Sequence, residues 1–196
     1  LVKELGGETK AFGHTSDFAS AEAWTKALDA TKAVFGDLPS YGALIAGTWD
    51  GGTYIHETKD DASYEKMMRT NTDTVYRALR ALLPSMVART HGSIVVVGSR
   101  AVERPWTSAG SAAYAASKSA AVALAQVTAQ EVLAYNVRVN AIMPSTMDTP
   151  ANRSAMPSVD PSTWVSLASA AGVIAFLLSN DSRDVSGAVI PVYGRA

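Results

Sequence analysis

The pattern of apolar and polar residues along this chain changes period several times, and it predicts helices and strands in alternation. Residues 19–35 repeat alanine and valine at helical spacing and run into Gly36, which is typical of a helix end. Residues 62–89 and 112–134 predict two longer helices, and residues 164–178 predict a last one. Helices of this kind need a sheet or another helix against which to bury their apolar faces.

Short apolar runs between these helices predict strands at residues 9–14, 41–46, 94–97, 137–142 and 188–192. Residues 94–97 are apolar at every position, as expected of a parallel strand that is buried on both faces. We therefore predict an α/β fold: a Rossmann-type, doubly wound parallel sheet between two layers of helices. Ligands in such sheets bind beyond the carboxyl ends of the strands.

Two polar stretches follow strands at that edge and are predicted as loops, at residues 99–111 and 144–162. The second is rich in Pro, Ser and Met and is too long for a plain connector. Loops of that length commonly cover or build a binding site. We therefore expect both stretches to contribute to a site.

Composition excludes several classes of protein. The 196 residues are 47% hydrophobic and 18% charged, which fits one globular domain over residues 1–196. A net charge of −1 with scattered Lys and Arg indicates neither a nucleic-acid surface nor a polybasic membrane patch, and no apolar run is long enough to cross a bilayer. The chain has no cysteine and its three histidines lack metal spacing, so we expect no disulfide and no metal site. The absence of cysteine and of a signal peptide favours the cytoplasm.

Tyr114 and Lys118 are the strongest candidates for chemistry. They stand four residues apart in a predicted helix, so both side chains leave the same face. An ammonium near a phenol favours the phenolate, so we expect Lys118 to lower the pKa of Tyr114 toward neutrality. A phenol tuned in this way can exchange a proton with a substrate oxygen. The spacing alone also occurs by chance in many helices.

Two further polar residues lie where such a site would form. Ser99 directly follows the predicted strand at residues 94–97, and Asn71 lies inside the predicted helix at residues 62–89. Ser99 alone could satisfy local backbone groups, and Asn71 alone could be a polar residue on an exposed helix face. Together with Tyr114 we favour functional roles for both.

The ordered set Asn71, Ser99, Tyr114, Lys118 and Pro144 with Thr149 resembles the short-chain dehydrogenase/reductase family over essentially the whole chain. The resemblance implies that Tyr114 is the acid/base and that Lys118 binds the nicotinamide ribose. It implies that Ser99 holds the substrate oxygen and that Asn71 anchors a proton-relay water. The expected reaction is hydride transfer between a nicotinamide cofactor and a carbonyl or alcohol substrate.

The resemblance also implies that the cofactor, NAD or NADP, contacts Tyr114, Lys118 and a further set of residues: Asp17, Ala46, Gly47, Pro144, Thr146 and Thr149. Asp17 matches the acidic residue that bonds adenine, although Ser16-Asp17 before a helix is also typical of a capping region. Members of the family commonly pair their two long helices, so a homodimer or homotetramer is expected.

A closer resemblance is to the dihydropteridine-reductase-like branch. The glycine-rich segment at residues 46–52, with Trp49 inside it, and the run from Asp148 to Trp164 both match that branch. Dihydropteridine reductases lack the serine and asparagine that this chain has at Ser99 and Asn71. We therefore prefer a general carbonyl or alcohol substrate and keep quinonoid dihydropteridine as an alternative.

The family begins with a strand, a glycine-rich turn, a helix and a second strand, whereas residues 1–7 resemble the end of the second helix. On the order of 40 residues would then be missing, and the opened sheet would leave backbone groups unpaired. Either the chain is part of a longer polypeptide, which we favour, or it is a degenerate relative unable to hold a dinucleotide in the usual way. The alternative hypothesis from another functional class is therefore a non-catalytic scaffold protein.

Overall fold

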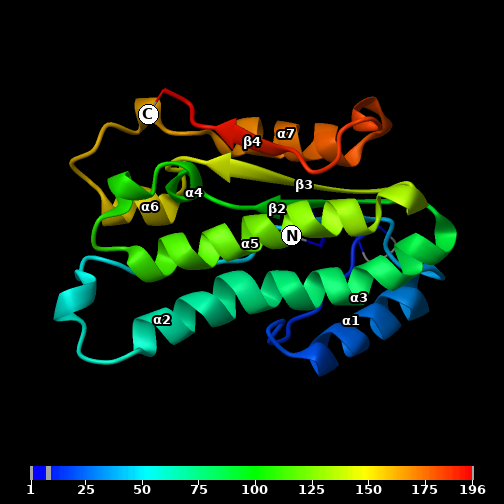
Figure 1. Cartoon of the computed structure of the whole chain (residues 1–196). Helices are drawn as coiled ribbons and strands as arrows, with labels where there is room; N and C mark the ends of the chain where they lie inside the picture. The colour runs from blue at the N-terminus through cyan, green and yellow to red at the C-terminus, as the bar shows by residue number, and fades with distance from the viewer. Residues whose placement is uncertain (1, 8–9, 196) are drawn as a thin grey trace.

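The computed structural model describes residues 2–7 and 10–195, and its centre is a parallel sheet with helices on both faces (Figure 1). The four strands are β1 (Tyr41–Leu44), β2 (Gly92–Val97), β3 (Val137–Pro144) and β4 (Val189–Val192). They lie in the order β1-β2-β3-β4 and all pair in parallel. The predicted α/β architecture is confirmed.

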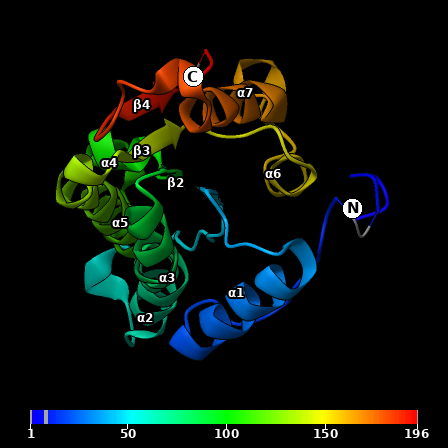
Figure 2. The ribbon, with the colours of Figure 1, turned by 90° about the vertical axis from the view of Figure 1, so that its right-hand side faces the viewer.

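The helices are α1 (Ala21–Phe35), α2 (Ala62–Met67), α3 (Thr74–Arg89), α4 (Arg100–Glu103), α5 (Ala112–Glu131), α6 (Pro150–Ala155) and α7 (Leu167–Leu178). A π-helical segment, η2 (Met68–Asp73), joins α2 to α3. Short 3-10 turns lie at η1 (Ile55–Glu57), η3 (Pro105–Ser108), η4 (Leu133–Tyr135), η5 (Pro161–Thr163) and η6 (Asn180–Ser182). Helices α3 and α5 cover one face of the sheet, α7 covers the other, and α1 lies against α3 (Figure 2).

The side chains of β2 contribute to two separate parts of the core, one on each face of the sheet. Successive side chains of a strand point to opposite faces. Ile94 and Val96 join a cluster with apolar residues of α3 and α5. Val95 joins a second cluster with Leu177 of α7. All three of these valine and isoleucine side chains are fully buried. Helices therefore pack against both faces of the sheet, and this packing fixes the positions of the residues at the ends of its strands.

The predicted helix at residues 62–89 is present, but η2 interrupts its regular winding. Pro84 does not end the helix and lies inside α3. A π-helical turn carries one extra residue, and such turns are frequent at functional sites. Here the turn contains Asn71, one of the candidate residues.

The strand predicted at residues 9–14 is wrong as far as the structure describes it. Thr9 lies outside the described residues, and residues 10–14 form no strand. The described part of the sheet ends at β1, so this segment has no neighbouring strand there with which to exchange hydrogen bonds.

Both predicted loops contain short helices. Ser99 caps α4 and Thr149 caps α6, each by accepting a backbone N–H of the first turn. The last helix begins at Leu167 rather than at Trp164, because Ser166 caps it through Ser169 N. Among the described residues, no helix has both the length and the apolar character needed to cross a membrane.

Candidate functional site

Three strand ends bring the candidate residues to one edge of the sheet. Gly47 lies in the loop after β1, Ser99 follows β2 and caps α4, and Pro144 is the last residue of β3. Helix α5 carries Tyr114 and Lys118 in its first two turns. The sequence therefore places these groups at the carboxyl edge of a parallel sheet, where ligands bind in such folds.

Tyr114 and Ser99 share a side-chain hydrogen bond, so the structure brings this predicted pair together. Burial raises the pKa of Tyr114 above its ordinary value, and the bond with Ser99 opposes that shift. The predicted lowering of the pKa of Tyr114 is therefore wrong for this structure. The tyrosine is a protonated phenol at neutral pH, which can donate a proton to an oxygen near Ser99.

Lys118 is almost fully buried, with 6% of its surface exposed. Its Nζ donates to the backbone oxygen of Val97 at 2.9 Å and forms no ion pair with any described residue. Desolvation lowers the pKa of Lys118 to about 8. An ammonium has three N–H donors, so two remain for groups that enter the site.

Asn71 is completely buried and uses its side-chain amide to join three segments. Its Oδ1 accepts from Thr48 N at 2.8 Å, while Nδ2 donates to Thr48 O and to Ser117 Oγ, each at 3.0 Å. The amide thus ties the loop after β1 and the π-helical turn to α5. Both N–H groups of the Asn71 side chain are used in these bonds. If Asn71 binds the water of a proton relay, it must therefore do so through its backbone.

Gly47 lies in close contact with this network. A Cβ at position 47 would lie 2.8 Å from Asn71 Oδ1 and 3.0 Å from Lys118 Nζ, closer than side chains pack. Glycine is therefore required for the loop to approach both residues. Ala46, its neighbour, is exposed at the same strand end.

The predicted cofactor residues after β3 form a turn that leads into α6. The oxygen of Thr146 accepts from Val165 N at 2.9 Å, and Thr149 Oγ1 accepts from Asn152 N at 3.1 Å. These bonds fix the path of the loop from Pro144 onward. Asp148, beside them, is bound by Arg153, which holds the pKa of that carboxyl below its usual range.

Asp17 lies outside this cluster of side chains. Its carboxylate accepts from Ala19 N at 3.1 Å in the turn before α1 and is ion-paired with Arg69 of η2. Asp17 does not cap α1, whose N-cap residue is Ser20, and the adenine-binding role of Asp17 stays a prediction. Residues 2–7 and 10–195 contain no group of three or more His, Asp and Glu that could hold a metal ion.

Sequence reasoning missed Ser117 as part of the site. Ser117 is completely buried, accepts from Asn71 Nδ2 and donates to Tyr114 O at 2.9 Å. The only signal was a hydroxyl one position before Lys118 in an alanine-rich helix. Its partner lies 46 positions earlier, so the contact depends on tertiary structure.

Comparisons with known proteins identify the family of the chain. Residues 1–160 match the family model described as short chain dehydrogenase. The 2,5-dichloro-2,5-cyclohexadiene-1,4-diol dehydrogenase LinX of Sphingobium indicum is 27% identical, and the alignment covers 99% of this chain and 81% of LinX. The 3-oxoacyl-acyl-carrier-protein reductase MabA of Mycobacterium tuberculosis is 31% identical over 68% of this chain and 57% of MabA.

Solved structures show the same fold. A 3-oxoacyl-acyl-carrier-protein reductase with bound NAD from Brucella melitensis superposes with a TM-score of 0.83 at 26% identity, covering 98% of this chain and 73% of that one. An NAD+-bound xylitol dehydrogenase superposes with a TM-score of 0.80 at 25% identity, covering 92% and 77% respectively.

Proposed function

The chain belongs to the short-chain dehydrogenase family, and on that premise we propose that it transfers a hydride between NAD or NADP and a carbonyl or alcohol substrate. The observation that carries the proposal is the hydrogen-bonded pair of Ser99 and Tyr114, with the buried amine of Lys118 on the same helix. We infer that the chain acts as a single domain of this enzyme class.

The residues at the sheet edge fit the nicotinamide half of such a cofactor. Lys118 has two N–H donors left after its bond to Val97 O, and these suit the hydroxyl groups of a ribose. The close approach of Gly47 to Asn71 and Lys118 leaves no room for a side chain between the loop and the amine. Pro144, Thr146 and Thr149 would border the ring from the loop after β3. When bound, the nicotinamide supplies or accepts the hydride.

The protein's own residues would handle the proton and the substrate oxygen. Reduction of a carbonyl leaves an oxyanion, and the protonated Tyr114 donates its proton to that oxygen. The hydroxyl of Ser99 donates a second hydrogen bond to the same oxygen and stabilises the developing charge. In the opposite direction Tyr114 must first lose its proton, so oxidation of an alcohol is favoured as the pH rises toward the raised pKa of Tyr114.

The names of the relatives support the proposed substrate class. LinX is named a dehydrogenase of a cyclic diol and MabA a reductase of an oxoacyl group, which supports a carbonyl or alcohol carbon as the reacting centre. Neither name supports the dihydropteridine alternative. The serine at position 99 and the asparagine at position 71 also separate this chain from that branch.

Titration of nicotinamide fluorescence with NADH and NADPH, followed by an assay on ketones and on quinonoid dihydropteridine, tests the proposal. We expect Tyr114→Phe to bind cofactor like the unaltered protein and to lose at least about 100-fold in turnover. Tyr135→Phe, an exposed tyrosine just after α5, is the matched control. Absence of cofactor binding would leave the non-catalytic scaffold as the better account, and activity confined to dihydropteridine would favour the alternative substrate.

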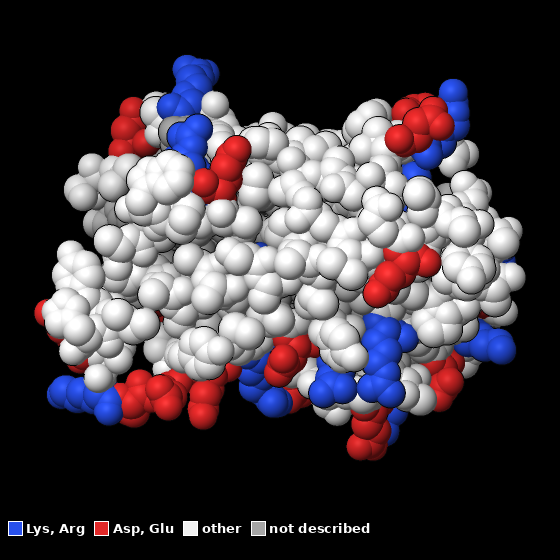
Figure 3. All heavy atoms as spheres, viewed as in Figure 1, with Lys and Arg blue, Asp and Glu red and all other residues white. Residues whose placement is uncertain are grey.

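We also propose that α5 forms an interface between copies of this chain. The face of the molecule along α5 is largely free of charged residues (Figure 3), and Val127 in the helix is 59% exposed. An uncharged face of small residues suits close packing of two identical helices. Val127→Lys should shift the protein to monomer in light scattering, whereas Val34→Lys on α1 should not; an unchanged mass for both would contradict this interface.

A further inference from the structure

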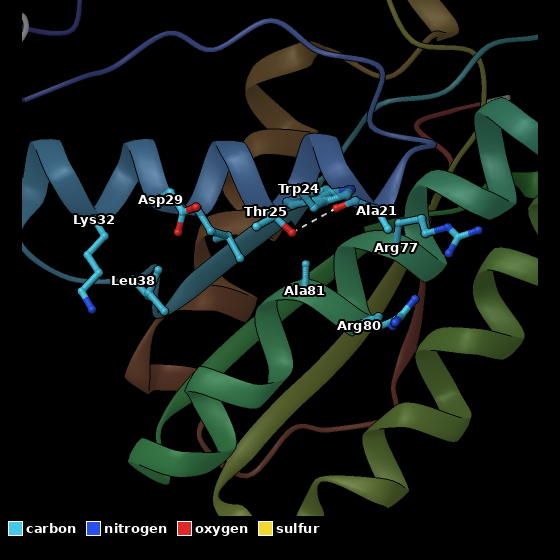
Figure 4. A pocket seen from close by; sticks show the side chains of 10 residues that line it. Ala21, Trp24, Thr25, Asp29, Lys32, Leu38, Arg77, Arg80 and Ala81 are labelled. Carbon is cyan, nitrogen blue, oxygen red and sulfur yellow. Dashed lines mark hydrogen bonds between the residues drawn. The ribbon is translucent and has the colours of Figure 1, made fainter.

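The groove between α1 and α3 contains a cavity of about 370 Å³ that shares no lining residue with the site described above (Figure 4). Its middle is apolar and is formed by Trp24 and Leu28 of α1 and Ala81 of α3. The indole N–H of Trp24 donates to Phe18 O at 3.0 Å, which holds the ring in place. The cavity therefore offers a fixed aromatic wall.

Cationic side chains lie at both ends of this groove. Arg77 and Arg80 come from one face of α3, and Lys32 comes from the last turn of α1 (Figure 4). Asp29 is the one carboxylate among the lining residues. The lining therefore carries an excess of positive charge, in a protein whose net charge is −1.

The guanidinium of Arg77 lies 5.8 Å from the ring centroid of its neighbour Tyr76, and the two arginines have no anionic partner in the described part of the chain. Neither Arg77 nor Arg80 forms an ion pair or hydrogen bond with another described residue, and Arg77 Nε is buried without an acceptor. A buried donor without an acceptor is costly, and native proteins seldom leave one.

We propose that this groove binds a small organic anion, with a carboxylate or phosphate ester held by Arg77 and Arg80 and an aromatic or aliphatic body against Trp24. Guanidinium groups match such oxyanions in pairs of parallel hydrogen bonds. The cavity has room for a body beyond the anionic group, and its middle is apolar. The proposal does not depend on the catalytic function and would hold for a protein without that activity.

Isothermal titration calorimetry with phenyl phosphate tests the proposal, with phenol and inorganic phosphate as the two partial ligands. We expect saturable binding of phenyl phosphate that weakens as salt is added, and at least about tenfold weaker binding of each partial ligand. Arg77→Gln/Arg80→Gln should weaken phenyl phosphate by about tenfold or more, since each guanidinium supplies charge-assisted bonds. Trp24→Leu should weaken phenyl phosphate but leave inorganic phosphate unchanged.

Arg183→Gln, an exposed arginine at the end of η6, is the matched control and should bind like the unaltered protein. Arg80→Gln alone, at an exposed position, keeps the test valid if the double variant does not fold. No binding of phenyl phosphate, equal binding of phenol, or unaltered binding by Arg80→Gln would each overturn the proposal. If inorganic phosphate bound as tightly as phenyl phosphate, the proposed contact between an apolar body and Trp24 would be wrong.

Discussion

At the scale of single residues, the burial of Lys118 lowers the stability of the fold while it supplies an amine to the site. Its amine is buried beside Gly47 and donates to the backbone oxygen of Val97, with no described carboxylate to neutralise it. Burial of that kind disfavours the charged form, which is why the pKa of Lys118 falls to about 8. Residues with such penalties cluster at functional sites, where binding chemistry outweighs stability.

We expect Lys118→Met to raise stability at pH 7 by about 1–3 kcal/mol while removing activity. The pKa of Lys118 is about 8 in the folded protein and 10.5 as a free side chain, so the unfolded chain binds the proton more tightly. The penalty is therefore complete below about pH 8 and disappears as the pH rises toward 10.5. The gain from Lys118→Met should shrink over that interval.

Urea denaturation at several pH values measures this difference. Lys26→Met is the control, because Lys26 is exposed on α1 and pairs with Glu22 at 2.7 Å. The control should show no gain at pH 7. A loss of stability in Lys118→Met at neutral pH would contradict the account of the buried amine.

At the scale of elements, side-chain hydrogen bonds join the π-helical turn η2 to helix α5. Ser117 accepts from Asn71, and Thr72 Oγ1 donates to Ser117 O at 3.0 Å. These bonds fix where α5 lies relative to the loop after β1, and so where Tyr114 and Lys118 lie. A regular α-helix through residues 68–73 would place Asn71 differently and break the connection.

Ser117→Ala should lower the free energy of unfolding by about 1–3 kcal/mol, because a buried N–H of Asn71 loses its acceptor. It should also reduce turnover, since α5 loses a constraint next to Tyr114. Ser119→Ala is a control in the same helix, because the hydroxyl of Ser119 is exposed and donates a hydrogen bond to Ala115 O at 2.8 Å. Equal stability and turnover in the two variants would show that the polar contact does not position the site.

At the scale of the whole molecule, Arg138 joins the sheet to helix α7. It lies in β3 with 9% of its surface exposed. Its guanidinium donates to Leu177 O at 2.7 Å, Ser179 O at 3.0 Å and Ser182 Oγ at 2.9 Å. One side chain thus gives a charged donor to two backbone oxygens at the end of α7, to which Ser93 Oγ and Ser182 Oγ also donate.

Arg138→Met should therefore destabilise the protein by about 2–4 kcal/mol, because several buried acceptors lose a charged donor at once. Thermal unfolding followed by circular dichroism measures the effect. Arg183→Gln, whose side chain is 76% exposed beside Asp184, should change stability by less than about 0.5 kcal/mol. Similar unfolding temperatures for Arg138→Met and the unaltered protein would show that water can replace these bonds.

The sequence by itself determined the class of fold, because hydrophobic periodicity depends on local spacing that can be read along the chain. The strands β1 to β4 and the helices α1, α3, α5 and α7 follow that spacing. Ser99, Tyr114 and Lys118 could be named as candidates because their residue types and order reflect chemistry. The cytoplasmic location stays a prediction.

Only the tertiary structure decided what depends on distant partners. The segment at residues 10–14 has the composition of a strand but no neighbouring strand among the described residues, so pairing overruled local pattern. The pKa of Tyr114 rises because burial, which spacing does not reveal, outweighs the hydrogen bond with Ser99. Ser117 joins the site through a residue 46 positions away. Burial and long-range contact are properties of the packed molecule, and no window of sequence contains them.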